Sequence, residues 1–481
     1  MTNEEIQLNE SNIQLCPEIN NDLQYYQIFQ EDLLHQHSNN NQRLTRQETF
    51  FNNRPQRTFW IYDFTSSSYS KINATLLSTG EKCYVYMQDQ CITELGEYTA
   101  IQQTEHICNE FDNIIYPRIT NLAGHPNGTL GDIDGDPRII ILVSQNPYSY
   151  YDQRNELDIE YSNLCEMFHF NYRTWIPTIA HELHHLIWFN NEMDEPHFTL
   201  EALAEYAMYH AGYLAPYDNK CPQVDLFLDH PEDSLLYWNM LNSIDYGGAY
   251  LFAFYIAEKY GVDILRDLIT EPSDGAYGIE NILKKAGNNI SFNELYLNWI
   301  TALTLDELGF KNDLYGFKNL DARVTQYTLI REDFIISEVK LYYYGFNVHK
   351  IQSPPNKFTI QIEKDPDKTI GLSIAFHDDL GWHIFQNLHN VGNNMIIENI
   401  SGSMINDLYI ITSYIFKQTP PPPNENGLGP FTYIEIKISD LGGNSLVPVF
   451  TIGGSFTLIL IVIVIVIIRK NYKLKKQSNW Q

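Results

Sequence analysis

The stretch that decides the fold reads Pro177-Thr178-Ile179-Ala180-His181-Glu182-Leu183-His184-His185-Leu186-Ile187. The apolar residues around the histidines predict a buried helix, and Pro177 suits its first turn because its ring already holds a helical φ. His181 and His185 are four residues apart, so on a helix both imidazoles project from one face and can reach one metal ion. Glu182 lies beside them, where a carboxylate can take a proton from a water that the metal has made acidic. We therefore expect His181 and His185 to bind metal and Glu182 to act as acid and base.

A pattern of only three specified residues also arises by chance in long proteins. The alternative to a metal site is a core helix whose histidines make ordinary hydrogen bonds. We expect His184, one turn from His181, to face solvent or to support the site from outside the coordination shell.

The next helical pattern, Leu200-Glu201-Ala202-Leu203-Ala204-Glu205-Tyr206, offers a third ligand. Glu201 and Glu205 are four residues apart on one helical face, and they cannot equally reach the same ion. Such a pair is often only a solvated helix face, but its position shortly after the histidines favours a metal site. A metal-bound histidine usually donates its second ring N–H to a carboxylate, and Glu205 could hold His181 in this way.

Over roughly residues 58 to 300 the chain resembles the gluzincin metallopeptidases, and within them the hyicolysin-like enzymes. The family segment Glu-Gly-x-Ala-Glu-Tyr corresponds here to Glu201–Tyr206, and the segments 111–117, 132–143 and 243–248 look similar too. The resemblance implies Zn²⁺ as the metal and Glu201 as the third ligand. The similar segments 111–117 and 132–143 imply an edge strand that pairs with extended substrate. Two departures are Ala202 in place of glycine and a gap between His185 and Glu201 shorter than in the thermolysin-like and aminopeptidase branches. Substrate preference therefore does not transfer.

An oxyanion-stabilising group is also expected in such a site. Tyr246 and His210 both have suitable side chains, and the sequence does not choose between them. We name Tyr246 as the catalytic candidate for this role.

The periodicity along the chain predicts an α+β fold. Residues 1–57 form a polar leader or pro-segment, and 58–318 form a gluzincin-type catalytic region with a mixed sheet, the active-site helix and a helical subdomain. Strand patterns are predicted at 58–62, 83–87 and 138–143, and helices dominate from 177 to 308. Residues 319–445 alternate with period two, as at 358–363 and 431–438, which predicts a β-sandwich-like domain.

The turn Gly131-Asp132-Ile133-Asp134-Gly135-Asp136-Pro137 resembles a calcium loop. An EF-hand requires glycine at its sixth position, where this chain has Pro137. We therefore favour an acidic turn without calcium.

Residues 446–468 carry no charge, and at about 1.5 Å per residue they are long enough to span a bilayer as a helix. The basic tail 469–481 would then be cytoplasmic, which places the acidic bulk outside the cell. No secretory signal is visible at the start of the chain, so a tail-anchored protein facing the cytosol is the alternative topology.

The composition excludes some functions. A formal charge of −29 argues against a nucleic-acid partner, while 14% aromatic and 44% apolar residues indicate a folded protein. Six cysteines lie in the first half without CxxC pairs, and disulfides are slightly favoured over buried free thiols.

Taken together, the sequence predicts a single-pass, membrane-anchored zinc endopeptidase that cleaves protein or peptide substrates at the cell surface. Hydrolysis would use metal-activated water without a covalent enzyme intermediate. The alternative is a non-catalytic surface binding or adhesion module that keeps the fold, although such a module has no need of Glu182.

Overall fold

The computed structural model describes residues 13–16, 54–126, 132–215, 218–239, 242–330, 335–387, 395–398, 404–421 and 429–440. Chain contacts group Met1–Ser439 as one compact unit and Asp440–Gln481 as a second. The predicted membrane span 446–468, the basic tail 469–481 and most of the leader 1–57 lie outside the described residues. No helix within the described ranges is long and apolar enough to cross a membrane.

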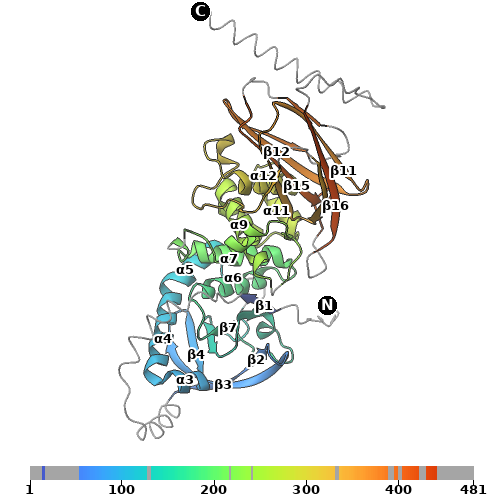
Figure 1. The fold of residues 1–481 in the computed structure, drawn as a ribbon. Coiled ribbons are helices and arrows are strands. Elements are labelled where there is room, and N and C mark those ends of the chain that lie inside the picture. The colour runs from blue at the N-terminus through green and yellow to red at the C-terminus, as the bar shows by residue number, and fades with distance from the viewer. Residues whose placement is uncertain are drawn as a thin grey trace, which may run out of the picture. The chain divides into compact units, whose positions relative to one another are not determined.

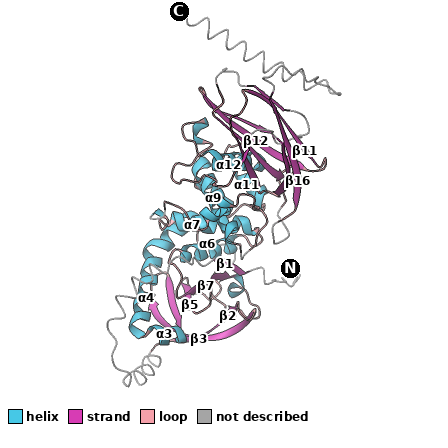
Figure 2. Cartoon of the chain, viewed as in Figure 1, coloured by secondary structure: helices cyan, strands magenta, loops and turns pink. Residues whose placement is uncertain are grey.

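The first unit mixes helices and strands, which confirms the predicted α+β class (Figure 2). Its first sheet has seven strands in the order β1-β6-β7-β5-β4-β3-β2. Their bounds are β1 Ile13–Cys16, β2 Gln56–Asp63, β3 Ser68–Thr79, β4 Cys83–Gln88, β5 Ile139–Ser144, β6 Ser149–Asp152 and β7 Met167–Asn171. The three predicted strand segments fall largely within β2, β4 and β5.

β5 lies inside this sheet and pairs parallel with both β4 and β7, so the expectation of an edge strand in the 132–143 segment is wrong. All of its residues are buried, as expected for a strand covered on both faces. Ile139, Ile141 and Val143 join the largest apolar cluster on one face, while Ile140 and Leu142 join a smaller cluster on the other.

Helices follow β4 and dominate after β7, as the periodicity predicted. The helices after β4 are α3 Asp89–Leu95, α4 Glu97–Glu110, the π-helix η3 Phe111–Ile115 and α5 Tyr116–Ala123. The later ones are α6 Thr178–Asn191, α7 His197–His210, α8 Val224–Asp229, α9 Ser243–Tyr260, α10 Asp263–Leu268, α11 Gly275–Lys285 and α12 Phe292–Leu305. Two short 3₁₀ turns are η4 Gln153–Glu156 and η6 Lys311–Asp313. Figure 1 shows α6 and α7 side by side, and the two helices are in contact.

The C-terminal part of the first unit contains two further sheets. One has the order β13-β12-β15-β10-β8 and the other β14-β11-β16-β9. The bounds are β8 Thr328–Ile330, β9 Ile335–Tyr342, β10 Phe346–Ile351, β11 Lys357–Lys364, β12 Thr369–Asp378, β13 Gly381–Asn387, β14 Met395–Glu398, β15 Asp407–Ile415 and β16 Phe431–Asp440. Side chains from both sheets form one apolar cluster.

The five-stranded sheet also packs against the helices. The Tyr296 hydroxyl on α12 lies 3.2 Å from Ser413 Oγ on β15, and Asn293 Nδ2 donates to the Phe416 carbonyl at 2.9 Å. Phe346 and Ile411 of this sheet belong to the same apolar cluster as the helical region. The helices and this sheet are therefore joined by a continuous core.

The five cysteines whose side chains the structure describes are buried free thiols, namely Cys83, Cys91, Cys108, Cys165 and Cys221. The favoured expectation of disulfides is therefore wrong for these residues. Cys83 Sγ and Cys108 Sγ lie 3.8 Å apart as a thiol contact. An even count of cysteines does not reveal pairing, because a thiol also packs well in an apolar core.

Candidate metal centre

Helix α6 is buried on every side. Each residue from Thr178 to Asn190 is buried, and the helix contacts β6, β7, α5 and α7. Pro177 is the residue at its N-terminal cap, as the sequence predicted. A helix that is apolar all round is held by the core rather than by a solvent face. The histidines on α6 are therefore fixed inside the protein.

Helix α7 is equally buried and packs against α6 and α9. The side chains of Glu201 and Glu205 are 0% exposed, so the pair is not a solvated helix face. Carboxylates are almost never fully buried unless they are paired or bind metal. Their burial therefore requires an oppositely charged partner or a metal ion.

Three ligand atoms converge between these helices. His181 Nε2 lies 2.9 Å from His185 Nε2, and Glu201 Oε2 lies 3.2 Å from His181 Nε2 and 3.4 Å from His185 Nε2. Ligands about 2.0 to 2.1 Å from a tetrahedral Zn²⁺ are separated by roughly 3.3 Å, so the spacing fits that ion. The two Nδ1 atoms and both Glu201 oxygens are buried without hydrogen bonds. The three residues thus fit a zinc ion.

Glu205 lies on the other side of the His181 ring. Its Oε1 is 3.5 Å from His181 Nδ1, the nitrogen that points away from the convergent atoms. Cys221 also lies against Glu205, and burial raises the pKa of this carboxyl to about 7 although His181 opposes that shift. The structure therefore gives the two glutamates different neighbours.

Glu182 is the one acidic residue of α6. Both of its oxygens are buried without a hydrogen bond of ordinary geometry. Burial raises its pKa well above the usual value, and the charge of His181 and the backbone amide of Tyr151 on β6 partly offset that shift. Burial raises the pKa of Tyr150, also on β6, well above its usual value, and the charge of Glu182 adds to that shift. The sequence did not single out these two tyrosines, because only the sheet brings β6 to α6.

The charges of the cluster are strongly coupled. Burial disfavours a charged His181, but Glu201, Glu182 and Glu205 raise its pKa to about 9. Burial lowers the pKa of His185 to about 4. Burial also opposes ionisation of Glu201, yet the two histidines lower its pKa to about 2. In this cluster the carboxylates outnumber the positively charged side chains.

His184 is 0% exposed, so it does not face solvent. Both of its ring nitrogens lack hydrogen bonds, and its ring packs at 5.7 Å from that of Trp188. Sequence periodicity gave no sign of this burial because α6 has no polar face.

The two oxyanion candidates lie in different places. His210 is nine residues beyond Glu201 on the same helix, about 13 Å along its axis, which removes it from the convergent atoms. Tyr246 is fully buried on α9, a helix in contact with α7, and its ring packs edge-on against Trp238 at 4.8 Å. Tyr246 therefore keeps its role as a prediction.

Strand β6 passes beside α6 and pairs antiparallel with β7 on one side. Its other side pairs antiparallel with β1, where Gln14 stands opposite Tyr151 and Cys16 opposite Ser149. A segment of the predicted leader therefore adds a strand next to the metal cluster.

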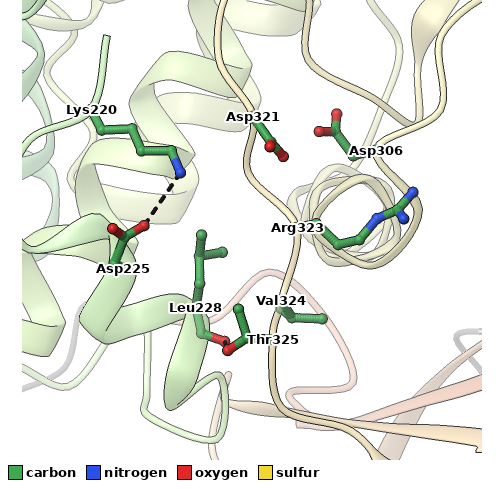
Figure 3. Close-up of a pocket in the computed structure, with 8 residues that line it drawn as sticks. All are labelled: Lys220, Asp225, Leu228, Asp306, Asp321, Arg323, Val324 and Thr325. Carbon is green, nitrogen blue, oxygen red and sulfur yellow. Dashed lines mark hydrogen bonds and ion pairs between the residues drawn. The ribbon is translucent and has the colours of Figure 1, made fainter. Parts of the chain in front are cut away.

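A separate cavity of about 460 Å³ lies on another part of the chain (Figure 3). Its wall includes Lys220, whose Nζ lies 3.3 Å from Asp225 Oδ1, and also Asp306 and Arg323. None of the metal-cluster residues lines it, so this cavity is not the candidate centre. Comparison of the sequence with models of protein families and with curated proteins finds no match.

Proposed function

We propose that this chain is a membrane-anchored, zinc-dependent endopeptidase. The observation that carries the proposal is the convergence of His181 Nε2, His185 Nε2 and Glu201 Oε2 within 2.9–3.4 Å of one another. These residues would be the zinc ligands, and Glu205 would orient His181 through Nδ1. Zn²⁺ held there would make a bound water acidic and polarise the scissile carbonyl.

Glu182 would move the proton. It follows a ligand directly on α6, and its carboxylate is buried beside the backbone amide of Tyr151. It would accept the proton of the attacking water and return it to the leaving amine. Tyr246 would stabilise the oxyanion if it approaches the substrate carbonyl.

Strand β6 supports binding of an extended peptide. A peptide can add to the free edge of a sheet through main-chain hydrogen bonds. β1 already pairs with that side of β6, and the amide of Tyr151 faces Glu182. A substrate strand would take the place of β1, with its scissile bond beside Glu182.

The finer parts of the architecture belong to the same proposal. Residues 58–318 would form a gluzincin-type region of the hyicolysin-like kind, and 319–445 a β-sandwich-like domain between it and the membrane. The shared core of the two C-terminal sheets supports the sandwich. Residues 446–468 would span the membrane, with the catalytic region outside the cell.

The rival function is a binding or adhesion module that keeps the fold. A module of this kind has no use for a fully buried carboxylate such as Glu182, whose burial is costly. The test is the metal content of the purified full chain together with casein hydrolysis. One zinc per chain, and activity that a chelator removes and added Zn²⁺ restores, would support the peptidase. Zinc without hydrolysis would favour the rival.

A further inference from the structure

A second group of carboxylates lies at the start of β5. Asp132, Asp134 and Glu166 each place an oxygen within 4.8 Å of the other two. The turn is shaped by its own side chains, because Asp132 Oδ1 accepts the amide of Gly135 at 2.6 Å and Asp134 Oδ1 accepts that of Asp136 at 2.8 Å. Each aspartate keeps its second oxygen for another partner.

Asp136, the third aspartate of the turn, is not part of this group. Its carboxylate accepts from Arg138 Nε at 2.9 Å and Nη2 at 2.8 Å, and from the Tyr84 hydroxyl at 2.9 Å. The linear aspartate pattern therefore does not describe the cluster. Glu166, thirty residues after Asp136, takes the place of that aspartate in the cluster.

The burial of the Glu166 carboxylate indicates a bound ligand. It directly precedes β7, and its side chain is only 3% exposed. Its Oε1 accepts the amide of Ile133 at 2.7 Å, whereas its Oε2 is buried without a hydrogen bond. A buried carboxylate oxygen with no partner is costly, and here it stands next to two further carboxylates.

We propose that Asp132, Asp134 and Glu166 bind one Ca²⁺ ion. All three offer hard oxygen ligands that lie within 4.8 Å of one another, so one ion can contact all three, and a set of three carboxylates suits Ca²⁺ better than Mg²⁺, which is usually held by one or two carboxylates and keeps several waters. Mg²⁺ requires a tighter octahedron with distances of about 2.0 to 2.1 Å. Water would complete the coordination on the exposed side of Asp134.

The electrostatics of the cluster agree with this geometry. Burial raises the pKa of Glu166, and the charges of Asp132 and Asp134 raise it further. Burial and the charges of Asp132 and Asp136 also raise the pKa of Asp134, and Arg57 offsets this only slightly. Its Nη2 donates instead to the Asn163 carbonyl at 2.6 Å. A divalent ion would offset the remaining repulsion.

A bound Ca²⁺ ion would link the segments that lead into β5 and β7. The acidic turn leads into β5, and Glu166 leads into β7, which pairs with β5 (Figure 2). Since α6 follows β7 in the chain, calcium would stabilise the sheet that supports the metal centre.

The test is a Ca²⁺ titration of the full chain, freed of calcium on a chelating resin, with and without one equivalent of Zn²⁺. Binding is expected with a Kd on the order of 10⁻⁴ to 10⁻³ M, the range of extracellular sites. At ten times Kd, calcium should raise the ratio of folded to unfolded protein about 11-fold, seen as a higher Tm. Mg²⁺ should bind more weakly.

Two variants locate the ion. Glu166→Gln keeps an acceptor for the Ile133 amide, and Asp134→Asn changes an exposed side chain but keeps an acceptor for the Asp136 amide. Both should lower calcium affinity at least 10-fold, whereas Asp158→Asn, an exposed acid nearby in sequence, should not. Equal affinity in Asp134→Asn and the parent chain, or no binding at 10 mM Ca²⁺, would overturn the proposal. Either result is independent of zinc and hydrolysis.

Discussion

Glu201 and Glu205 lie one turn apart on α7, equally buried, and we predict different consequences when each is removed. Glu201 Oε2 is 3.2 and 3.4 Å from the two Nε2 atoms, so Glu201→Ala removes one of three convergent ligand atoms. Stoichiometric zinc should be lost. Of the two histidines, Glu205 approaches only His181, at 3.5 Å from the far nitrogen Nδ1. Glu205→Ala should therefore retain zinc with weaker affinity.

The magnitude follows from that geometry. Loss of a carboxylate that orients a metal-bound histidine typically costs 10-fold to 100-fold in affinity or activity. Because 3.5 Å is longer than an ordinary N–H···O hydrogen bond, we expect the lower end for Glu205→Ala, about 10-fold or about 1.4 kcal/mol.

The assay is competition for Zn²⁺ against a chromogenic chelator, measured on both variants and the parent chain. Glu201→Gln and Glu205→Gln serve as controls of equal size, which separate ligand loss from the cavity that alanine leaves in the core. Unfolding of each zinc-free variant shows whether the fold survives. Weaker zinc binding in Glu205→Ala than in Glu201→Ala would refute the assignment and exchange the two roles.

Three further predictions concern other parts of the chain. Protease added to intact cells should remove the bulk before residue 446 and leave the tail protected; a shielded, unglycosylated bulk would indicate the tail-anchored topology. Prolines at Gln14 and Leu15 remove amide donors from β1. They should lower KM for an extended peptide if β1 competes with substrate, and an unchanged KM would contradict that competition. In Gly247→Ala the new Cβ would lie 2.2 Å from the Gln223 carbonyl oxygen. Overpacking should cost about 1–3 kcal/mol, which exceeds the gain of about 1 kcal/mol in helix propensity, so we expect Gly247→Ala to lower the denaturation midpoint. A higher midpoint would contradict this, because it would show that the contact relaxes freely.

Local patterns predicted the elements that carry the metal cluster. The apolar residues around His181 and His185 indicated a buried helix, and α6 covers that stretch. The spacing of Glu201 and Glu205 placed both on one face of α7, which turned out to be buried. Alternation with period two also predicted β11 and β16. Such patterns depend on neighbours within a few residues, so a single sequence shows them.

Contacts between distant segments could not be predicted in the same way. Glu166 joins Asp132 and Asp134 only because β7 pairs with β5, and Tyr151 approaches Glu182 only because β6 passes α6. The spacing of the aspartates in the acidic turn does not show that the Asp136 carboxylate accepts hydrogen bonds from Arg138. The burial of His184 was missed for a different reason, since a helix without a polar face has no periodicity that separates inside from outside.

Glu182→Gln tests the peptidase assignment most directly, because it keeps the size of the side chain and all three convergent ligand atoms. The measurement is zinc content and casein hydrolysis of this variant beside the parent chain. Loss of a positioned acid and base typically costs 10² to 10⁴ in rate, so we predict one zinc per chain and at least about a 100-fold lower turnover. A variant that holds zinc and hydrolyses casein at a near-normal rate would contradict the role of Glu182 and the mechanism built on it.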